Sequence, residues 1–294
     1  MTTPGVYMKK WFYLALLLVT GCSKNPTAPA YQKELSVFGY LWGGKPLSAD
    51  RALLLTWTRP ITDYYSLNEA ALTHASVVMT EKETGRQVVL HNTDAAPAYY
   101  YNDSLLVQPD HTYTLTIRVE ERTVTAETRV PAAIRLNTTL SGDAANRVQP
   151  TNLGFEQPVF VECDKPEQIL LVDMYCNEPF DNAEYINPFS DNNKNPRNQE
   201  EYDGGRNAEP RHIRAFMKYQ DIAAPLYGGR HVIYWYGSML VFWGSNTLQV
   251  LAVDDNFHRY LYMEHPELNG GVSGGIGLFG SVCGEQYHLQ VVKE

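Results

Sequence analysis

The sequence predicts a mainly β protein, and two observations support this fold class. Short apolar segments recur between turn residues, and few of them have the three- or four-residue spacing of a helix. Residues 112–119 (TYTLTIRV) alternate between polar and apolar side chains, as a strand with one buried and one solvated face does. Such elements bury their apolar faces by packing sheet on sheet.

The first half of the chain contains seven of these segments. They are residues 35–42, 52–57, 75–81, 87–91, 98–101, 112–119 and 123–130. Seven strands at this spacing are typical of an immunoglobulin-like or fibronectin-like β-sandwich. Because proline cannot continue a β-ladder, the Val130-Pro131 step ends this domain.

A tyrosine corner is expected where the sixth of these strands begins. Leu106, Pro109 and Tyr113 follow the pattern of that motif, in which the phenol hydroxyl bonds to the backbone just upstream. The alternative is an ordinary half-buried strand tyrosine. Parity also places Val119 opposite Val124, which keeps the apolar side chains of the hairpin on one face.

The second half is also mostly β and carries a long polar insert. Strands are expected at 134–140, 158–163, 169–175, 213–219, 232–243, 247–253 and 287–292, with one short helix at 255–264. Residues 177–211 are rich in Asn, Asp, Glu and Pro, and a loop of this length is usually functional or disordered. We expect a first domain over 32–132 and a second, β-sandwich-like domain over 133–294.

The N-terminal residues have the features of a lipoprotein export signal. Two lysines precede an apolar run at 11–19 (WFYLALLLV), which is shorter than the ~20 residues of a membrane-spanning helix. Small residues then lead directly to Cys22, whose thiol is the natural lipid acceptor, as in a bacterial lipobox. The sequence therefore predicts a lipid anchor, such as palmitate, on Cys22.

The expected signal peptide covers residues 1–21, and a small, polar tether covers 22–31. Since no basic side chain precedes Met8, we hypothesise that translation starts there. Removal of the two lysines leaves 22 basic against 33 acidic residues, so the net charge changes from −9 to −11. This charge argues against nucleic acid or anionic lipid as the main partner.

Three cysteines remain in the expected mature chain beyond Cys22, namely Cys163, Cys176 and Cys283. In an oxidising compartment two of them can form a disulfide, and the sequence does not choose among the three pairings. The alternative is that each is a small, buried apolar side chain.

No motif for catalysis or cofactor binding has the sequence context that it needs. Residues 275–280 (GIGLFG) spell GxGxxG, but a loop precedes them and a strand-like segment follows, so a glycine-rich bulge or hairpin is favoured over a dinucleotide site. Residues 191–195 begin like a calcium loop, but Pro196 stands where glycine is needed. No HExxH motif and no P-loop occurs, and we expect no GxSxG nucleophile elbow. We therefore expect neither an enzyme nor a cofactor or metal site.

Tyrosine is abundant, with twenty residues, and one aromatic run consists of Tyr234, Trp235 and Tyr236. Aromatic side chains with polar rims suit protein interfaces and stacking on sugar rings. The alternative is that they fill half-buried strands, where aromatic residues are favoured. These three residues are the candidate binding residues.

The chain resembles an uncharacterised family of bacterial outer-membrane lipoproteins, domain of unknown function 4249. The resemblance rests on the lipobox at Cys22, the strand at 35–40 (LSVFGY), the strand at 113–119 before Val130-Pro131, and residues 274–281 (GGIGLFGS). It implies a lipid-anchored protein of the outer membrane, on its periplasmic or surface side, in bacteria rich in TonB-dependent transporters. The family supplies no catalytic residues, and the insert at 177–211 departs from its pattern.

Three functions are weighed on these grounds. The first is a non-enzymatic accessory or binding lipoprotein that presents a β-scaffold to a TonB-dependent outer-membrane transporter or another envelope protein. The second is a glycan-binding lipoprotein that uses the run at 234–236. An envelope hydrolase comes last, because no catalytic motif supports it. Coplanar exposed aromatic rings would favour a glycan, and a flat apolar patch would favour a protein partner.

Overall fold

The computed structural model describes residues 31–142, 144–150, 153–179, 184, 186, 212–262 and 270–293. The chain divides into two compact units. The described residues of the first unit are 31–33 and 59–64, and the second unit holds 34–58 and those from 65 onward. All of the helices and strands named below belong to the second unit. No helix in the described ranges is long and apolar enough to cross a membrane.

The seven predicted strands of the first half all form, and they make a β-sandwich. One sheet contains β1 (Leu35–Trp42), β3 (Leu53–Trp57) and β6 (Ala96–Leu106), and the other contains β5 (Gln87–Thr93), β4 (Ser76–Glu81), β7 (Thr112–Val119) and β8 (Arg122–Arg129). An irregular pairing of β5 with β6 connects the two sheets. Buried side chains from both sheets form one core. This is the strand arrangement of an immunoglobulin-like sandwich.

The alternation predicted for β7 holds, and so does the tyrosine corner. Tyr113, Leu115 and Ile117 are buried in the core, while the threonines between them lie at its edge or in solvent. The hydroxyl of Tyr113 accepts a hydrogen bond of 2.8 Å from the backbone N–H of Gln108. The phenol therefore fixes the chain segment that leads into β7.

The register predicted for the β7–β8 hairpin is wrong by two residues. Val119 pairs with Arg122, and Val124 pairs with Ile117 instead. The turn consists of only two residues, and Glu120 adopts a φ of 53° to close it. Since a shift by two residues preserves parity, the buried faces still coincide.

In the second half, a four-stranded group carries the main core. β12 (Ile169–Cys176) lies between β13 (His212–Lys218) and β16 (Gly244–Val253), and β16 pairs in turn with β18 (Ile276–Val291). β16 is buried on both faces, because Leu248 and Val250 enter one core while Leu251 and Val253 enter another. Burial on both faces explains why this strand reads as a nearly continuous apolar run.

A smaller sheet contributes to the same core. It contains β14 (Ala223–Ala224), β15 (Arg230–Ile233), β11 (Val159–Glu162) and β9 (Arg135–Asn137). The short remaining elements are β2 (Pro46–Leu47), η1 (Ala49–Arg51), α2 (Leu67–Ala70), β10 (Asn146–Val148), α3 (Leu153–Glu156), η4 (Tyr219–Ile222), η5 (Pro225–Tyr227), η6 (Trp235–Met239), α5 (Asp255–Tyr262) and β17 (Val272–Ser273). The predicted helix thus forms as α5, with residues 263–264 outside the described part of the chain.

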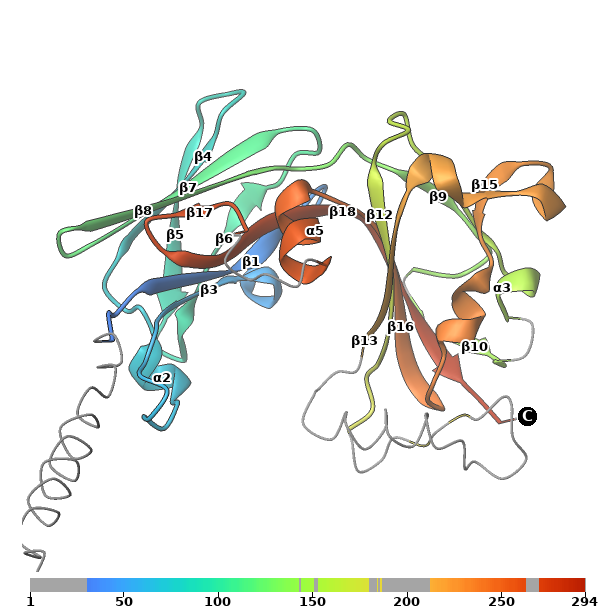
Figure 1. Ribbon diagram of the computed structural model, residues 1–294, viewed down its shortest axis with the longest axis horizontal. Coiled ribbons are helices and arrows are strands. Elements are labelled where there is room, and N and C mark those ends of the chain that lie inside the picture. Colours follow the sequence, from blue (N-terminus) through green and yellow to red (C-terminus); the bar gives the residue numbers. More distant parts are fainter. Residues whose placement is uncertain are drawn as a thin grey trace, which may run out of the picture. The chain divides into compact units, whose positions relative to one another are not determined.

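The last strand, β18, is far longer than the predicted segment 287–292. Its first residues run parallel to β1, and its later residues run antiparallel to β16 (Figure 1). Phe279 enters the core of the first sandwich, and Leu289 enters that of the second half. The division near residue 132 stays a prediction, and the structure adds that the C-terminal strand contributes to both cores.

The GxGxxG sequence lies within β18 and serves close backbone packing. Gly277 has a φ of 115°, and a Cβ added there would stand 2.0 Å from the carbonyl oxygen of Val37 in β1. Only glycine tolerates both the dihedral angle and the approach. The segment therefore joins two strands, and no helix follows it as a dinucleotide site would require.

Candidate functional site

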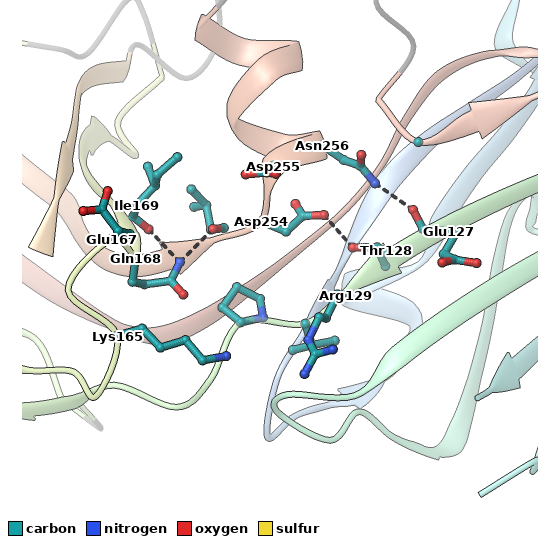
Figure 2. Close-up of a pocket in the computed structure, with 14 residues that line it drawn as sticks. Glu127, Thr128, Arg129, Lys165, Glu167, Gln168, Ile169, Asp254, Asp255 and Asn256 are labelled. Carbon is teal, nitrogen blue, oxygen red and sulfur yellow. Dashed lines mark hydrogen bonds between the residues drawn. The ribbon is translucent and has the colours of Figure 1, made fainter. Parts of the chain in front are cut away.

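A groove of about 560 Å³ lies beside the start of α5. Its walls come from the end of β8, from the loop between β11 and β12, and from the first residues of α5 (Figure 2). In the loop, the amide of Gln168 donates to the carbonyl oxygens of Ile169 and Val253, at 3.1 and 2.9 Å. These bonds hold the loop against the end of β16.

Asp254 forms the floor of this groove and fixes three elements to one another. One carboxylate oxygen accepts from the hydroxyl of Thr128 at 2.6 Å, and the other accepts from the backbone N–H groups of Phe257 and Ser281, at 2.9 and 3.0 Å. Asp254 is thus the N-cap of α5 and a bridge from β8 to β18. Burial raises the pKa of its carboxyl group, although the hydrogen bonds act in the opposite direction.

The neighbouring residue Asn256 adds a second bridge at the same place. Its side-chain amide donates to the carbonyl oxygen of Glu127 at 2.7 Å (Figure 2) and to that of Phe279 at 3.1 Å. The groove therefore has a rigid floor of hydrogen bonds between β8, β18 and α5.

The cations of the groove are paired within the protein. Lys165 and Arg129 both bind one oxygen of Asp110, at 2.8 and 3.2 Å, and these bonds hold the pKa of the aspartate below its usual range. Lys218 neutralises Glu167, which lies in the same loop as Lys165. Because its charges are compensated in this way, the groove offers no concentrated field for an ionic substrate.

A second feature is an aromatic cluster at the surface, the Tyr234 patch, defined as Phe155, Phe160, Tyr227 and Tyr234, of which Phe155 is exposed and the other three are half-buried. The ring centroid of Tyr234 lies 5.0 Å from that of Phe155 and 5.8 Å from that of Tyr227. Phe155 is 54% exposed. Arg230 lies at the rim, with its guanidinium carbon 4.1 Å from the ring centroid of Phe160. Leu226, which precedes Tyr227 in η5, is 76% exposed.

Only one of the three candidate binding residues belongs to this patch. The strand predicted at 232–243 ends at Ile233, and the chain turns into η6 instead. Tyr236 is fully buried, its hydroxyl donates to the carbonyl oxygen of Gln157 at 2.7 Å, and burial raises its pKa. Trp235 is half-buried against the core. Tyr236 is therefore part of the core, whereas Tyr234 and Trp235 are both half-buried.

No pattern in the sequence predicts that Phe155 lies next to Tyr234. A Cβ on Gly154 would lie 1.6 Å from the carbonyl oxygen of Tyr234, so glycine is what lets α3 pack directly on this backbone. A contact between segments some 80 residues apart depends on tertiary packing. The pair Leu226-Tyr227 before two glycines was a local hint of an exposed turn.

The disulfide predicted between two of the three cysteines does not form, because Cys163, Cys176 and Cys283 are all free thiols. Cys176 pairs in register with Asn246 of β16, and Cys283 with Ala252 of the same strand. At ~3.3 Å per residue, this offset separates the two thiols by about 20 Å, and a disulfide needs Cα atoms within ~7 Å. Burial raises the pKa of both thiols, as expected of small core side chains.

Several predicted features lie outside the described residues. They are the signal peptide at 1–21, the lipid acceptor Cys22, the translation start at Met8, the calcium-like segment at 191–195 and most of the insert at 177–211. Within the described ranges, no group of three His, Cys, Asp or Glu side chains comes together in the manner of a metal site.

No protein-family model matches the chain, and no curated protein matches it. Among solved structures, the crystal structure of chicken CNTN1 FN1-FN3 domains is similar over 74% of this chain, with 10% sequence identity and a TM-score of 0.21. This chain spans 57% of the length of that one. So low a TM-score carries no argument, and the fold assignment rests on the strand pairing and the shared core. The resemblance to domain of unknown function 4249 stays a prediction.

Proposed function

We propose that the protein is a lipid-anchored lipoprotein of the cell envelope, attached through Cys22, that binds another envelope protein without catalysing a reaction. The observation that carries the binding role is the Tyr234 patch. A partly exposed aromatic cluster with an arginine at the rim has the composition of the energetic centres of protein interfaces. The lipobox pattern at Cys22 supports the envelope location.

The geometry of the patch favours a protein partner over a glycan. The rings of Phe155 and Tyr227 are tilted against that of Tyr234 by 43° and 39°. A sugar stacks on a ring face, and rings inclined in this way do not offer one common plane to a chain of sugars. Leu226 adds an aliphatic side chain beside them, and aliphatic surface of this kind packs well against another protein.

The partner proposed is an outer-membrane protein, and a TonB-dependent transporter is the first to test. The native lipoprotein would be cross-linked in cells and purified in mild detergent, and its bound proteins would be identified by mass spectrometry. Recovery of one β-barrel transporter in near-equal amount is the expected result. Recovery of the lipoprotein alone, or bound only to glycan, would contradict the proposal.

Two surface substitutions test whether the patch makes the contact. Phe155→Asp and Leu226→Asp place a charge on exposed side chains, so the fold should survive while the yield of partner falls at least about tenfold, the equivalent of ~1.4 kcal/mol. Val89→Asp is the matched control, because Val89 is 64% exposed on β5 of the first sandwich. An equal loss with the control variant would exclude a specific role of the patch.

A further inference from the structure

A turn in the first unit exposes two large apolar side chains for which the proposed binding role has no use. Residues 59–64 (RPITDY) follow strand β3, and the backbone N–H of Asp63 donates to the carbonyl oxygen of Pro60 at 2.9 Å. Ile61 stands at the tip of this turn and is fully exposed, and Tyr64 is 90% exposed. Full exposure of an isoleucine costs free energy in water unless another phase or partner covers it.

The turn follows Thr58 in the chain, and Thr58 is hydrogen-bonded to Glu34, which follows the segment that leads from Cys22. The backbone N–H of Thr58 donates to the carbonyl oxygen of Glu34 at 2.8 Å, and the N–H of Glu34 donates to the hydroxyl of Thr58 at 2.9 Å. These two bonds hold together the residue that follows the N-terminal segment and the residue that precedes the turn. Residue 34 lies twelve positions after Cys22, and the fully extended length of this segment is only about 40 Å.

The charges of the turn do not oppose contact with a bilayer. Its two charged residues, Arg59 and Asp63, pair with each other at 3.7 Å. Since the expected mature chain is strongly acidic, it would not approach an anionic membrane by electrostatic attraction. Insertion of apolar side chains is the remaining means of contact, and tyrosine is a residue enriched at the membrane interface.

We propose that Ile61 and Tyr64 insert into the interface of the bilayer that holds the lipid anchor. The lipid on Cys22 would then be the first membrane contact and the turn the second. This inference rests on the proposed lipid anchor.

The test uses the full lipoprotein, purified from membranes and reconstituted into vesicles of phosphatidylethanolamine and phosphatidylglycerol. The vesicles contain a phosphatidylethanolamine with a photoactivatable diazirine near the glycerol backbone. After illumination, cross-linked peptides are mapped by mass spectrometry, and acylation of Cys22 is read from the mass of the same samples. Labelling of the peptide that contains Ile61 and Tyr64 is the expected result, and it should persist in high salt because the contact is apolar.

Variants make the outcome specific. Ile61→Asp combined with Tyr64→Asp should reduce labelling of this peptide about tenfold or more, because burying a charge in the interface is costly. Val89→Asp should leave it unchanged. Acylated Cys22 with an unlabelled turn would overturn this inference while the anchor stands. An unmodified Cys22 would overturn the proposed anchor, and labelling of the turn in that sample would still support the membrane contact.

Discussion

At the scale of single residues, Tyr113 connects strand pairing to loop geometry. Its hydroxyl accepts from the N–H of Gln108 and also contacts the carboxylate of Glu81 at 3.3 Å. Burial raises the pKa of this phenol to about 12, so it stays protonated at all ordinary pH values. Glu81 in turn receives hydrogen bonds from Thr84 and His111, and these hold its pKa below the usual value although burial acts against them.

Tyr113→Phe should therefore lower the free energy of unfolding by about 1–2 kcal/mol, because the half-buried N–H of Gln108 loses its acceptor while the ring still packs. Denaturant unfolding at neutral pH measures the change. Tyr99→Phe is the matched control, since Tyr99 is an exposed residue of β6. Equal stability of the two variants would mean that the corner bond contributes nothing.

The contribution of Asp254 to the stability of the fold should depend on pH. Burial raises its folded-state pKa above the ordinary value of 3.8, so the folded protein holds this proton more tightly than the unfolded chain does. The resulting stabilisation is complete below 3.8 and is lost as the pH rises through the raised folded value. The side chain of the Asp254→Asn variant cannot titrate. The free energy of unfolding of the wild type should therefore fall relative to that of this variant as the pH rises across that window.

Asp254→Ala is the companion variant, because it leaves the N–H groups of Phe257 and Ser281 without their acceptor. It should lower stability by about 1–3 kcal/mol at every pH. Unfolding curves recorded from pH 3 to 8 for the three proteins would decide the matter. A wild type that parallels the asparagine variant throughout would refute the assigned role.

At the scale of elements, the β1–β18 pairing depends on Gly277. Replacement by alanine would bring a Cβ within 2.0 Å of the carbonyl oxygen of Val37, and the strands would have to separate. Gly85→Ala is the matched control, because Gly85 also has a positive φ, of 70°, but open space around its Cβ position. The control should cost about 1 kcal/mol for the dihedral angle alone, and Gly277→Ala clearly more. Calorimetric melting of both variants would separate the cost of the dihedral angle from the cost of the steric clash with Val37.

The elements also mark where sequence reasoning succeeds. The alternation in β7 predicts a half-buried strand because its period is set by local geometry, and the continuous apolar run of β16 fits burial on both faces. The run at 232–243 has the same apolar composition but folds differently. The strand ends at Ile233 and η6 begins at Trp235, Gly154 of α3 packs against the backbone of Tyr234, and nothing in the local pattern encodes that contact.

The candidate site was less accessible to prediction than the fold. The aromatic run at 234–236 predicts Tyr234 as a binding residue. Its neighbours Phe155 and Tyr227 come from α3 and η5, which lie outside this run. The groove beside Asp254 likewise requires knowledge of where β8 and β18 meet. A single sequence contains the residues of such sites but not their proximity, since the proximity follows from tertiary packing.

At the scale of the whole second unit, β18 has a consequence for cooperativity. This one strand is hydrogen-bonded to β1 in the first sandwich and to β16 in the second half, and its side chains enter both cores. Neither core can lose its part of β18 without disturbing a strand that the other also uses. We therefore expect the two halves to unfold together, although their sequences suggest separate domains.

Two core truncations on β18 test this expectation. Phe279→Ala removes a buried ring from the first core and should cost about 3–5 kcal/mol, and Leu289→Ala removes a buried side chain from the second core and should cost about 2–5 kcal/mol. If β18 couples the cores, each variant lowers the midpoint of one common transition, observed alike by tryptophan fluorescence and far-ultraviolet circular dichroism. If the halves were independent, each substitution would split the curve and move only one of two steps, and the strand would be a connection without energetic coupling.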